Sequence, residues 1–96
     1  MRLMKFVLDV TLQQNERALD RLVNLIGRRE YRILDMRVDG TSRDGFYLVR
    51  CSIESARRAE VLVRFVEKLY DVETARWELF DSNAHSLLVE VMPLAP

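Results

Sequence analysis

A strand–helix–strand pattern between residues 6 and 38 constrains the fold of this 96-residue chain more than any other feature. Apolar and polar residues alternate from Met4 to Leu12, which is typical of a strand with one buried face. A helical repeat follows, whose apolar stripe consists of Leu19, Leu22, Val23 and Ile26. Alternation returns from Leu34 to Val38, and the second half of the chain repeats the helix and its flanking strands. The sequence therefore predicts two copies of one strand–helix–strand unit.

The predicted elements follow the order β-α-β-β-α-β. We expect one helix from Asn15, whose side chain can cap it, to Arg29, and a second helix that begins at Ser55. The predicted strands cover residues 4–12, 31–38, 46–53 and 72–79, with a short fifth strand at 87–92. This order is that of the α+β ferredoxin-like plan, an antiparallel sheet with two helices on one face. The spatial strand order is then 4-1-3-2, which leaves the second and fourth strands at the edges.

Three local expectations accompany this plan. Glu16 falls in the predicted first turn of the first helix, where the helix dipole favours an anion. The end of that helix lacks the glycine that often follows a helix, so Glu30 or Tyr31 must take its place. The sheet face away from the helices is expected to be of mixed polarity, with Lys5, Val7, Asp9, Ile33, Phe46 and Leu48.

Length and composition exclude several classes of protein. Ninety-six residues suit one domain, with residues 1–79 as its body and 80–96 as a C-terminal extension of the same domain. Fifteen basic and fifteen acidic residues leave no net charge to attract nucleic acid or an anionic membrane. No apolar run is long enough for a membrane span, and the first strand begins too early for a signal peptide. The single cysteine, Cys51, excludes an internal disulfide and fits a reducing, cytoplasmic location.

The sequence offers little catalytic chemistry. The only histidine, His85, lies in a predicted loop with no apparent nucleophile, and we interpret it as an ordinary loop residue. Cys51 alternates with core residues and is expected to be a small buried side chain. Trp77 is expected to serve packing or an interface. One histidine and one cysteine cannot complete a zinc site, and three glycines form no phosphate-binding loop. We therefore predict no catalytic residue, metal or cofactor.

Three stretches resemble a known family. They are Asn-Glu-Arg-Ala-Leu-Asp-Arg-Leu at 15–22, Gly-Arg-Arg-Glu-Tyr at 27–31 and Glu-Lys-Leu-Tyr-Asp-Val at 67–72. The first resembles the start of the first helix of ACT domains. The second is similar to an Arg-Arg-Gly-Phe segment, and the third to a Lys-Leu-x-Asp-Val segment. Together they resemble the small regulatory subunit of acetolactate synthase, most closely its short, valine-insensitive type, over about residues 4–79.

The resemblance implies regulation rather than catalysis. Such subunits form homodimers through their sheet edges, which here implicates Ile33, Leu34, Asp35 and Met36. They bind the large catalytic subunit of a thiamine-dependent synthase and raise its activity. Many also bind valine between the loop before the first helix and the second strand of the neighbouring chain. The corresponding positions here are Gln14, Asn15, Glu16, Arg17, Ala18, Arg32 and Ile33. Because the family's Asn-x-Pro-Gly is replaced by Gln14-Asn15-Glu16-Arg17, the resemblance implies an amino-acid site that is weak or lost.

Two other functions remain open at the level of sequence. The chain could be a free-standing ACT module that binds an amino acid or other small ligand and regulates a different enzyme. It could also be a small enzyme on the same fold, such as an acylphosphatase. That enzyme needs a phosphate-binding loop with an arginine, and the loop at 13–17 lacks the necessary glycines.

Overall fold

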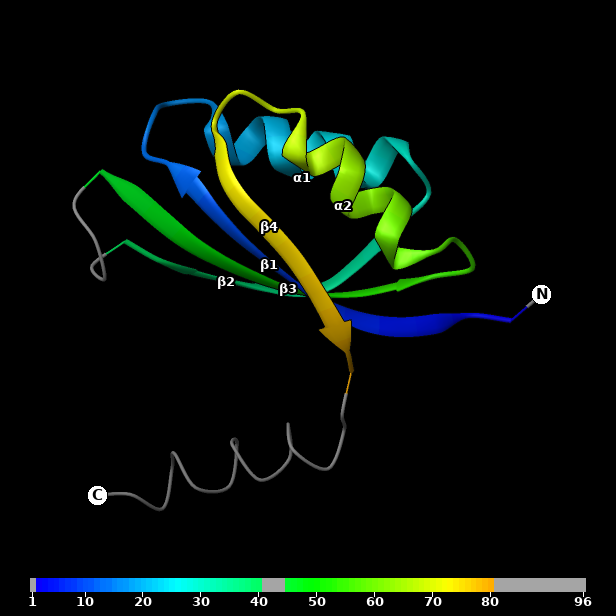
Figure 1. The fold of residues 1–96 in the computed structure, drawn as a ribbon. Coiled ribbons are helices and arrows are strands. Elements are labelled where there is room, and N and C mark those ends of the chain that lie inside the picture. The colour runs from blue at the N-terminus through cyan, green and yellow to red at the C-terminus, as the bar shows by residue number, and fades with distance from the viewer. Residues whose placement is uncertain (1, 41–44, 81–96) are drawn as a thin grey trace, which may run out of the picture.

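A computed structural model of the chain describes residues 2–40 and 45–80. The described residues form an antiparallel sheet and two helices (Figure 1). In chain order the elements are β1 (Met4–Gln13), α1 (Ala18–Arg28), β2 (Arg32–Asp39), β3 (Phe46–Ser55), α2 (Ala59–Glu67) and β4 (Val72–Leu79). The predicted ferredoxin-like order is confirmed. The expected fifth strand at 87–92, the extension from residue 81 and His85 lie outside the described residues.

The sheet has the strand order β2-β3-β1-β4, as predicted, and both helices cover the same face of it (Figure 1). β1 is a central strand, and it pairs antiparallel with both β3 and β4. Leu8 marks its middle, since it lies opposite Cys51 on one side and Trp77 on the other. β2 and β4 are the two edge strands of the described sheet.

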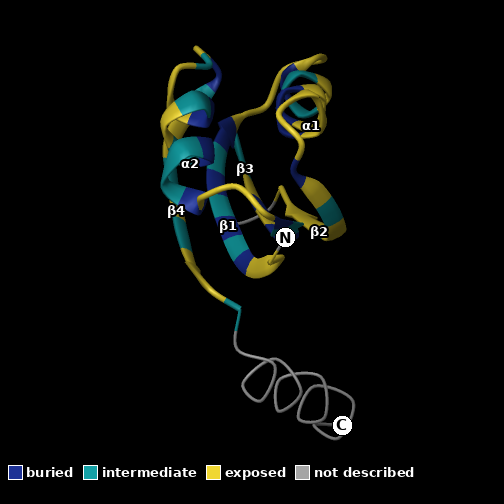
Figure 2. Ribbon diagram, turned by 90° about the vertical axis from the view of Figure 1, so that its right-hand side faces the viewer, coloured by how far each residue is buried: buried dark blue, intermediate teal, exposed yellow. Residues whose placement is uncertain are grey.

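The core lies between the sheet and the helices (Figure 2). Alternate side chains of β1 face it and are at most 2% exposed: Phe6, Leu8, Val10 and Leu12. The helices contribute five side chains that are fully buried: Ala18, Leu22, Ile26, Leu62 and Val66. The ring of Phe6 meets those of Tyr31 and Trp77 edge-on, each with centroids 6.1 Å apart, so the packing role predicted for Trp77 is confirmed. Cys51 is buried, also as predicted.

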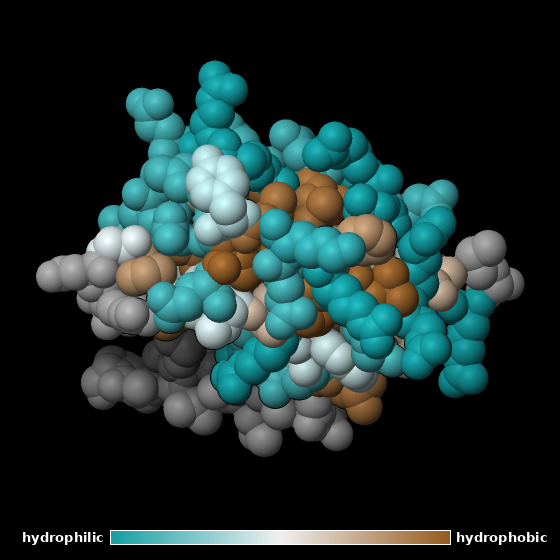
Figure 3. Space-filling model, turned by 45° about the horizontal axis from the view of Figure 1, so that its top comes forward, coloured by the Kyte–Doolittle hydropathy of each residue, from teal (hydrophilic) through white to brown (hydrophobic). Residues whose placement is uncertain are grey.

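The side that the helices cover is mainly hydrophilic at its surface, and apolar side chains show between the polar ones (Figure 3). Val23 of α1 is one exposed apolar residue of this layer, at 39%. α2 is amphipathic as well, since Ala59, Leu62 and Val66 are buried whereas Arg64 is exposed. Amphipathic helices on one face of the sheet thus explain the two periodicities of the sequence.

The alternation predicted for β2 is wrong at one position. The pairing with β3 shifts between Ile33 and Asp35, as in a β-bulge, so Leu34 is an extra residue in the strand. Ile33 and Met36 therefore both pack against the core, whereas Leu34 is 39% exposed. Ile33 does not lie on the open face, contrary to expectation. Strict alternation cannot reveal such an extra residue, because each position is assigned to a face by counting in twos.

Both helices begin later than predicted. α1 starts at Ala18, so Glu16 precedes it, and the acidic residue of its first turn is Asp20. The Asn15 side chain accepts a hydrogen bond from the Arg17 amide and forms a local turn instead of capping the helix. α2 starts at Ala59, and neither helix has a side-chain cap.

The second expected cap, Ser55, is the last residue of β3. Its hydroxyl donates to the Glu30 carbonyl and accepts from the Arg57 amide, both at 3.0 Å. This hydroxyl therefore joins the end of β3 to the exit of α1. As with Asn15, a short polar side chain bonds to nearby backbone before the helix begins.

Glu30 ends α1 in the left-handed conformation, with φ of 68°. The Glu30 amide donates to the Gly27 carbonyl and the Tyr31 amide to the Ile26 carbonyl, which is the hydrogen-bond pattern of a Schellman motif. The expectation that Glu30 or Tyr31 must replace a glycine is thus confirmed for Glu30. The Glu30 carboxylate also pairs with Arg57 at 2.7 Å.

Candidate functional site

The loop between β1 and α1, residues 14–17, crosses one end of the sheet. Gln14 holds it there, since its side-chain amide donates to the carbonyls of Gly40 at 3.2 Å and Phe46 at 3.0 Å. The Gln14 backbone amide also donates to the Gly45 carbonyl. A Cβ atom at Gly40 would lie 3.3 Å from both the Gln14 amide and the Tyr47 ring, so glycine suits this close approach. The loop is thereby fixed to the ends of β2 and β3.

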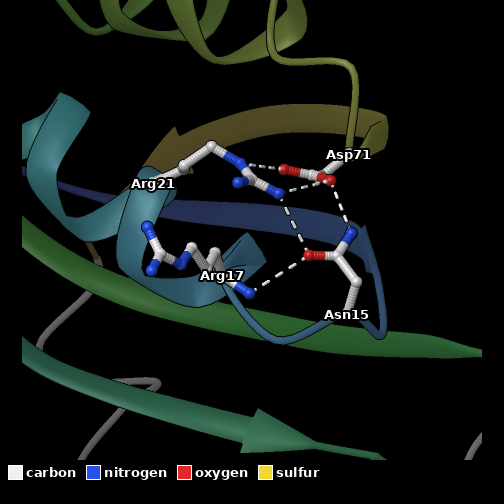
Figure 4. A network of polar contacts seen from close by, with 4 residues as sticks. All are labelled: Asn15, Arg17, Arg21 and Asp71. Atoms are coloured by element: carbon white, nitrogen blue, oxygen red, sulfur yellow. Dashed lines mark hydrogen bonds and ion pairs between the residues drawn. The ribbon is translucent and has the colours of Figure 1, made fainter.

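A polar network fixes the same loop to the connection between α2 and β4 (Figure 4). Asp71 of that connection accepts a hydrogen bond from the Asn15 side chain at 2.6 Å. Arg21 of α1 donates to both Asp71 oxygens, from Nε at 2.7 Å and from Nη2 at 3.1 Å. The same Nη2 atom donates to Asn15 Oδ1 at 3.0 Å, and the Arg17 amide donates to that oxygen at 3.2 Å. The loop and the adjoining start of α1 therefore meet the α2–β4 connection at one carboxylate, 50 or more positions away in the sequence.

The Asp71 side chain is fully buried, whereas that of Arg21 is 32% exposed. Hydrogen bonds from Arg21, and then from Asn15, hold the pKa of Asp71 below its usual range, although burial acts in the opposite direction. Asp71 in turn raises the pKa of Arg21. The guanidinium also stacks on Tyr70, 4.9 Å from the ring centroid. Arg21 and Asp71 are therefore an ionised pair at neutral pH, and Asp71 also accepts the hydrogen bond from Asn15 of the loop.

Comparison with known proteins assigns the chain to a family. A family model described as the ACT domain matches residues 14–75, which include the loop, both helices and the network. The chain belongs to the ACT domain family. A search of curated proteins finds no match to this ACT domain.

Solved structures share the fold at low sequence identity. The ACT domain of GTP pyrophosphokinase from Chlorobium tepidum matches with a TM-score of 0.68 and 11% identity, covering 80% of this chain and all of that one. The C-terminal domain of the MgtC protein from Mycobacterium tuberculosis matches at 0.65 and 14%, covering 81% and 88%. Formyltetrahydrofolate deformylase from Burkholderia mallei matches at 0.61 and 20%, covering 80% of this chain and 28% of that one. At these identities the likeness concerns the fold.

The residues expected at the amino-acid site of this ACT domain lie in two places. Gln14, Asn15, Glu16 and Arg17 form the loop, and Ala18 is fully buried at the start of α1. Arg32 and Ile33 begin β2 at the opposite end of the sheet, because Arg32 pairs with Glu54 whereas the loop follows the Gln13–Phe46 pair. One chain does not bring the two groups together. The family resemblance implies that a neighbouring chain supplies Arg32 and Ile33 to the site.

Two residues of the network were not among the expected site residues. Arg21 and Asp71 are 50 positions apart, and no local pattern indicates that they pair. Both do lie inside stretches that carry the family resemblance, at 15–22 and 67–72. Asp71 is a charged residue directly before the first residue of β4, and this position is the signal that could have drawn attention to it.

The described residues offer no evident catalytic group. Burial, with smaller contributions from Asp35 and Asp9, raises the pKa of Cys51 to about 12, so the sulfur remains a protonated thiol. Within residues 2–40 and 45–80 no group of three or more His, Cys, Asp or Glu residues could hold a metal. In the same ranges, neither helix has the length and apolar character needed to cross a bilayer. ACT domains are typically regulatory ligand-binding modules, and this chain belongs to that family.

Proposed function

We propose that this ACT domain is a noncatalytic regulatory subunit that binds and activates the large catalytic subunit of acetolactate synthase. The observation that supports it best is the contact between Asn15, Arg21 and Asp71. These residues come from two of the stretches that resemble such subunits, and they meet in one network. Two stretches that resemble these subunits thus meet at the loop where ACT domains of this type bind effectors.

Activation by such a subunit requires no reacting group in this chain. A partner enzyme that exists in two conformations is activated when its active conformation binds the regulator more tightly. A rigid domain that presents a fixed surface can supply this difference in affinity. The buried core and the network around Asp71 provide that rigidity.

We further propose that the functional form is a homodimer joined at the edge strand β2. In the described residues β2 pairs with β3 on one side, which leaves its other edge able to accept a strand. The residues at this edge include Ile33, Leu34, Asp35 and Met36. Sedimentation of the chain at high micromolar concentration is expected to give a dimer, and a monomer would contradict the proposal.

The same structure supports a weak or absent response to valine. A bound amino-acid carboxylate would need free donors at the loop, but the Asn15 amide and the Arg21 guanidinium already serve Asp71. Arg17 also stands where the family has a glycine that lets the backbone approach the ligand. Calorimetry with valine, leucine and isoleucine is expected to show no saturable binding below about 100 μM, which corresponds to roughly −5.5 kcal/mol. Tighter binding would contradict this interpretation of the loop.

The decisive experiment adds the purified chain to the isolated catalytic subunit of an acetolactate synthase from the same source. Turnover is expected to rise and to saturate as the complex forms. The pure chain alone, assayed for synthase and acylphosphatase activity, is the control and is expected to have neither. A complex that forms without any change in turnover would refute the proposal.

A second candidate is an ACT module that binds an amino acid or other ligand and regulates a different enzyme. The fold match to a part of formyltetrahydrofolate deformylase favours keeping this candidate, since there the matched region is 28% of a longer chain. Copurification with native partners separates the two candidates. Recovery of a large synthase subunit supports the first, and recovery of an unrelated enzyme supports the second.

A further inference from the structure

The sheet face opposite the helices carries a row of charges, one from each strand. Arg37 of β2 lies opposite Arg50 of β3, which lies opposite Asp9 of β1, which lies opposite Arg76 of β4. Neighbouring strands are about 4.8 Å apart, so the row spans roughly 14 Å from end to end. Like charges directly opposite each other destabilise a sheet. The Arg37–Arg50 pair is therefore unfavourable except where acidic groups neutralise its two guanidinium groups.

The three arginines of the row differ in how far they are neutralised. Arg50 is paired twice, with Asp9 at 3.2 Å and with Glu78 at 2.5 Å. Arg76 reaches Asp9 only at 3.9 Å, and its side chain is 85% exposed. Arg37 is exposed and has no hydrogen bond or ion pair with another residue of the described ranges. The two guanidinium groups at the ends of the row are thus the ones available to a ligand.

A hollow of about 590 Å³ lies over this row, and we call it the open-face hollow. Its lining includes Asp9, Arg37, Leu48, Arg50, Thr74 and Arg76. The volume falls within the range of small-molecule sites, about 300–1,000 Å³. Leu48 is 44% exposed and provides an apolar surface, while Thr11 and Thr74, which are paired across β1 and β4, provide hydroxyl groups. The lining has three arginines against two aspartates, Asp9 and Asp39.

We propose that the open-face hollow binds a small organic dianion whose two acidic groups contact Arg37 and Arg76. The planar guanidinium matches a carboxylate or a phosphate with two parallel hydrogen bonds, so either acidic group fits. A negative group beside Arg37 also offsets its repulsion by Arg50. The hollow lies on the sheet face away from α1 and shares no residue with the Asn15–Arg21–Asp71 network. This inference goes beyond the proposed function and does not depend on it.

The test is an NMR titration of the isotope-labelled full chain at low salt, where charge interactions are least screened. Suberate and 1,6-hexanediol bisphosphate, whose acidic groups are joined by flexible chains long enough to approach both ends of the row, are the dicarboxylate and bisphosphate probes, which separate carboxylate from phosphate recognition, and acetate is the single-charge control. We expect saturable shift changes centred on Arg37, Arg50 and Arg76 below about 1 mM for at least one probe. Acetate is expected to bind at least about tenfold more weakly, because it engages only one end of the row.

Substitutions then assign the binding to the row. Arg37→Ala and Arg76→Ala should each weaken binding by about tenfold or more, as expected for loss of a charge-assisted hydrogen bond. Arg37→Lys should restore only part of the affinity, since lysine lacks the planar fork. Arg64→Ala is the matched control, because Arg64 is exposed on α2, on the other side of the molecule. The amide spectrum of each variant verifies its fold, and the two end arginines are independent tests.

Three results would overturn the proposal. The first is an absence of saturable shifts with either probe up to about 10 mM, a concentration beyond any specific site of this kind. The second is an equal loss of affinity in Arg64→Ala and Arg37→Ala, which would indicate general charge attraction. The third is a set of shifts centred on Arg17 and Arg21, which would place the anion at the loop instead. None of these outcomes depends on whether the chain activates a synthase.

Discussion

Replacement of Asp71 by asparagine tests whether the buried carboxylate holds the loop and the helices together. The substitution keeps the shape of the side chain and removes its charge. Asp71 accepts three hydrogen bonds, one from Asn15 and two from Arg21. Asparagine retains one acceptor oxygen and presents an NH2 group where the other oxygen was. This NH2 group then lies against an N–H donor of Asn15 or Arg21, and no hydrogen bond forms between two donors.

The magnitude follows from burial and from the number of bonds lost. Hydrogen bonds to charged groups contribute about 1.5–3 kcal/mol each, and breaking a fully buried ion pair costs about 3–5 kcal/mol. The Arg21 side chain is 32% exposed, so water can solvate the guanidinium once it is released. We therefore expect Asp71→Asn to lower the free energy of unfolding by about 2–3 kcal/mol at pH 7. For a domain of this size the melting temperature should fall by roughly 10–20 °C.

Urea unfolding followed by circular dichroism measures this effect, with Asp20→Asn as the control. Asp20 undergoes the same chemical change in the exposed first turn of α1 and should lose less than about 1 kcal/mol. The pKa of Asp71 is lowered in the folded chain, so its contribution is present above the usual value of about 3.9 and is lost as the pH falls through the folded pKa. The difference between wild type and Asp71→Asn should therefore shrink on acidification below about pH 4. A loss under about 0.5 kcal/mol at pH 7, or one that acid leaves unchanged, would refute this reasoning.

Three further predictions concern stability and reactivity. Glu30→Gly should raise the free energy of unfolding by about 0.5–1 kcal/mol, because it relieves a left-handed non-glycine residue and loses only an exposed ion pair; lower stability in urea would contradict this. Leu8→Ala should lower that free energy by about 2–5 kcal/mol, since Leu8 is fully buried in the central strand; a loss under 1 kcal/mol would show that the core collapses around it. Cys51 should resist a thiol reagent at pH 8 in the native chain and react fully in urea, because burial raises its pKa to about 12; rapid native labelling would show that the core opens readily.

The sequence predicted the order, type and pairing of the described elements because their periodicities are strong. β4 begins and ends at the predicted residues, since Ala75 and Trp77 alternate with polar residues, although its pairing with β1 shifts register between Thr74 and Val72. The bulge at Leu34 escaped prediction because an extra residue changes which face a side chain occupies without changing the composition of the strand. The starts of the helices were misplaced because Asn15 and Ser55 can bond to nearby backbone in a turn as well as cap a helix.

The candidate site was predictable only in part. The residues from Gln14 to Arg17 do form a loop before α1, as the family resemblance implied. The ion pair between Arg21 and Asp71 was not predicted, because it joins residues 50 positions apart that become neighbours only when α1 packs beside the α2–β4 connection. The row of arginines on the open face was equally hidden, since it depends on the register of all four strands.

The bulge in β2 has a consequence for how two copies could meet. On the side that pairs with β3, it limits the uninterrupted ladder to residues 35–39, and we take the same segment for a partner strand at the free edge. Two such segments paired antiparallel about a twofold axis are centred on Arg37, so the two Arg37 side chains would be neighbours across the axis. The charged rows of the two copies would then form one continuous row, with Arg37 and Arg50 of each copy around the junction. An anion bound there would strengthen the dimer, and the dimer would strengthen anion binding by the same factor.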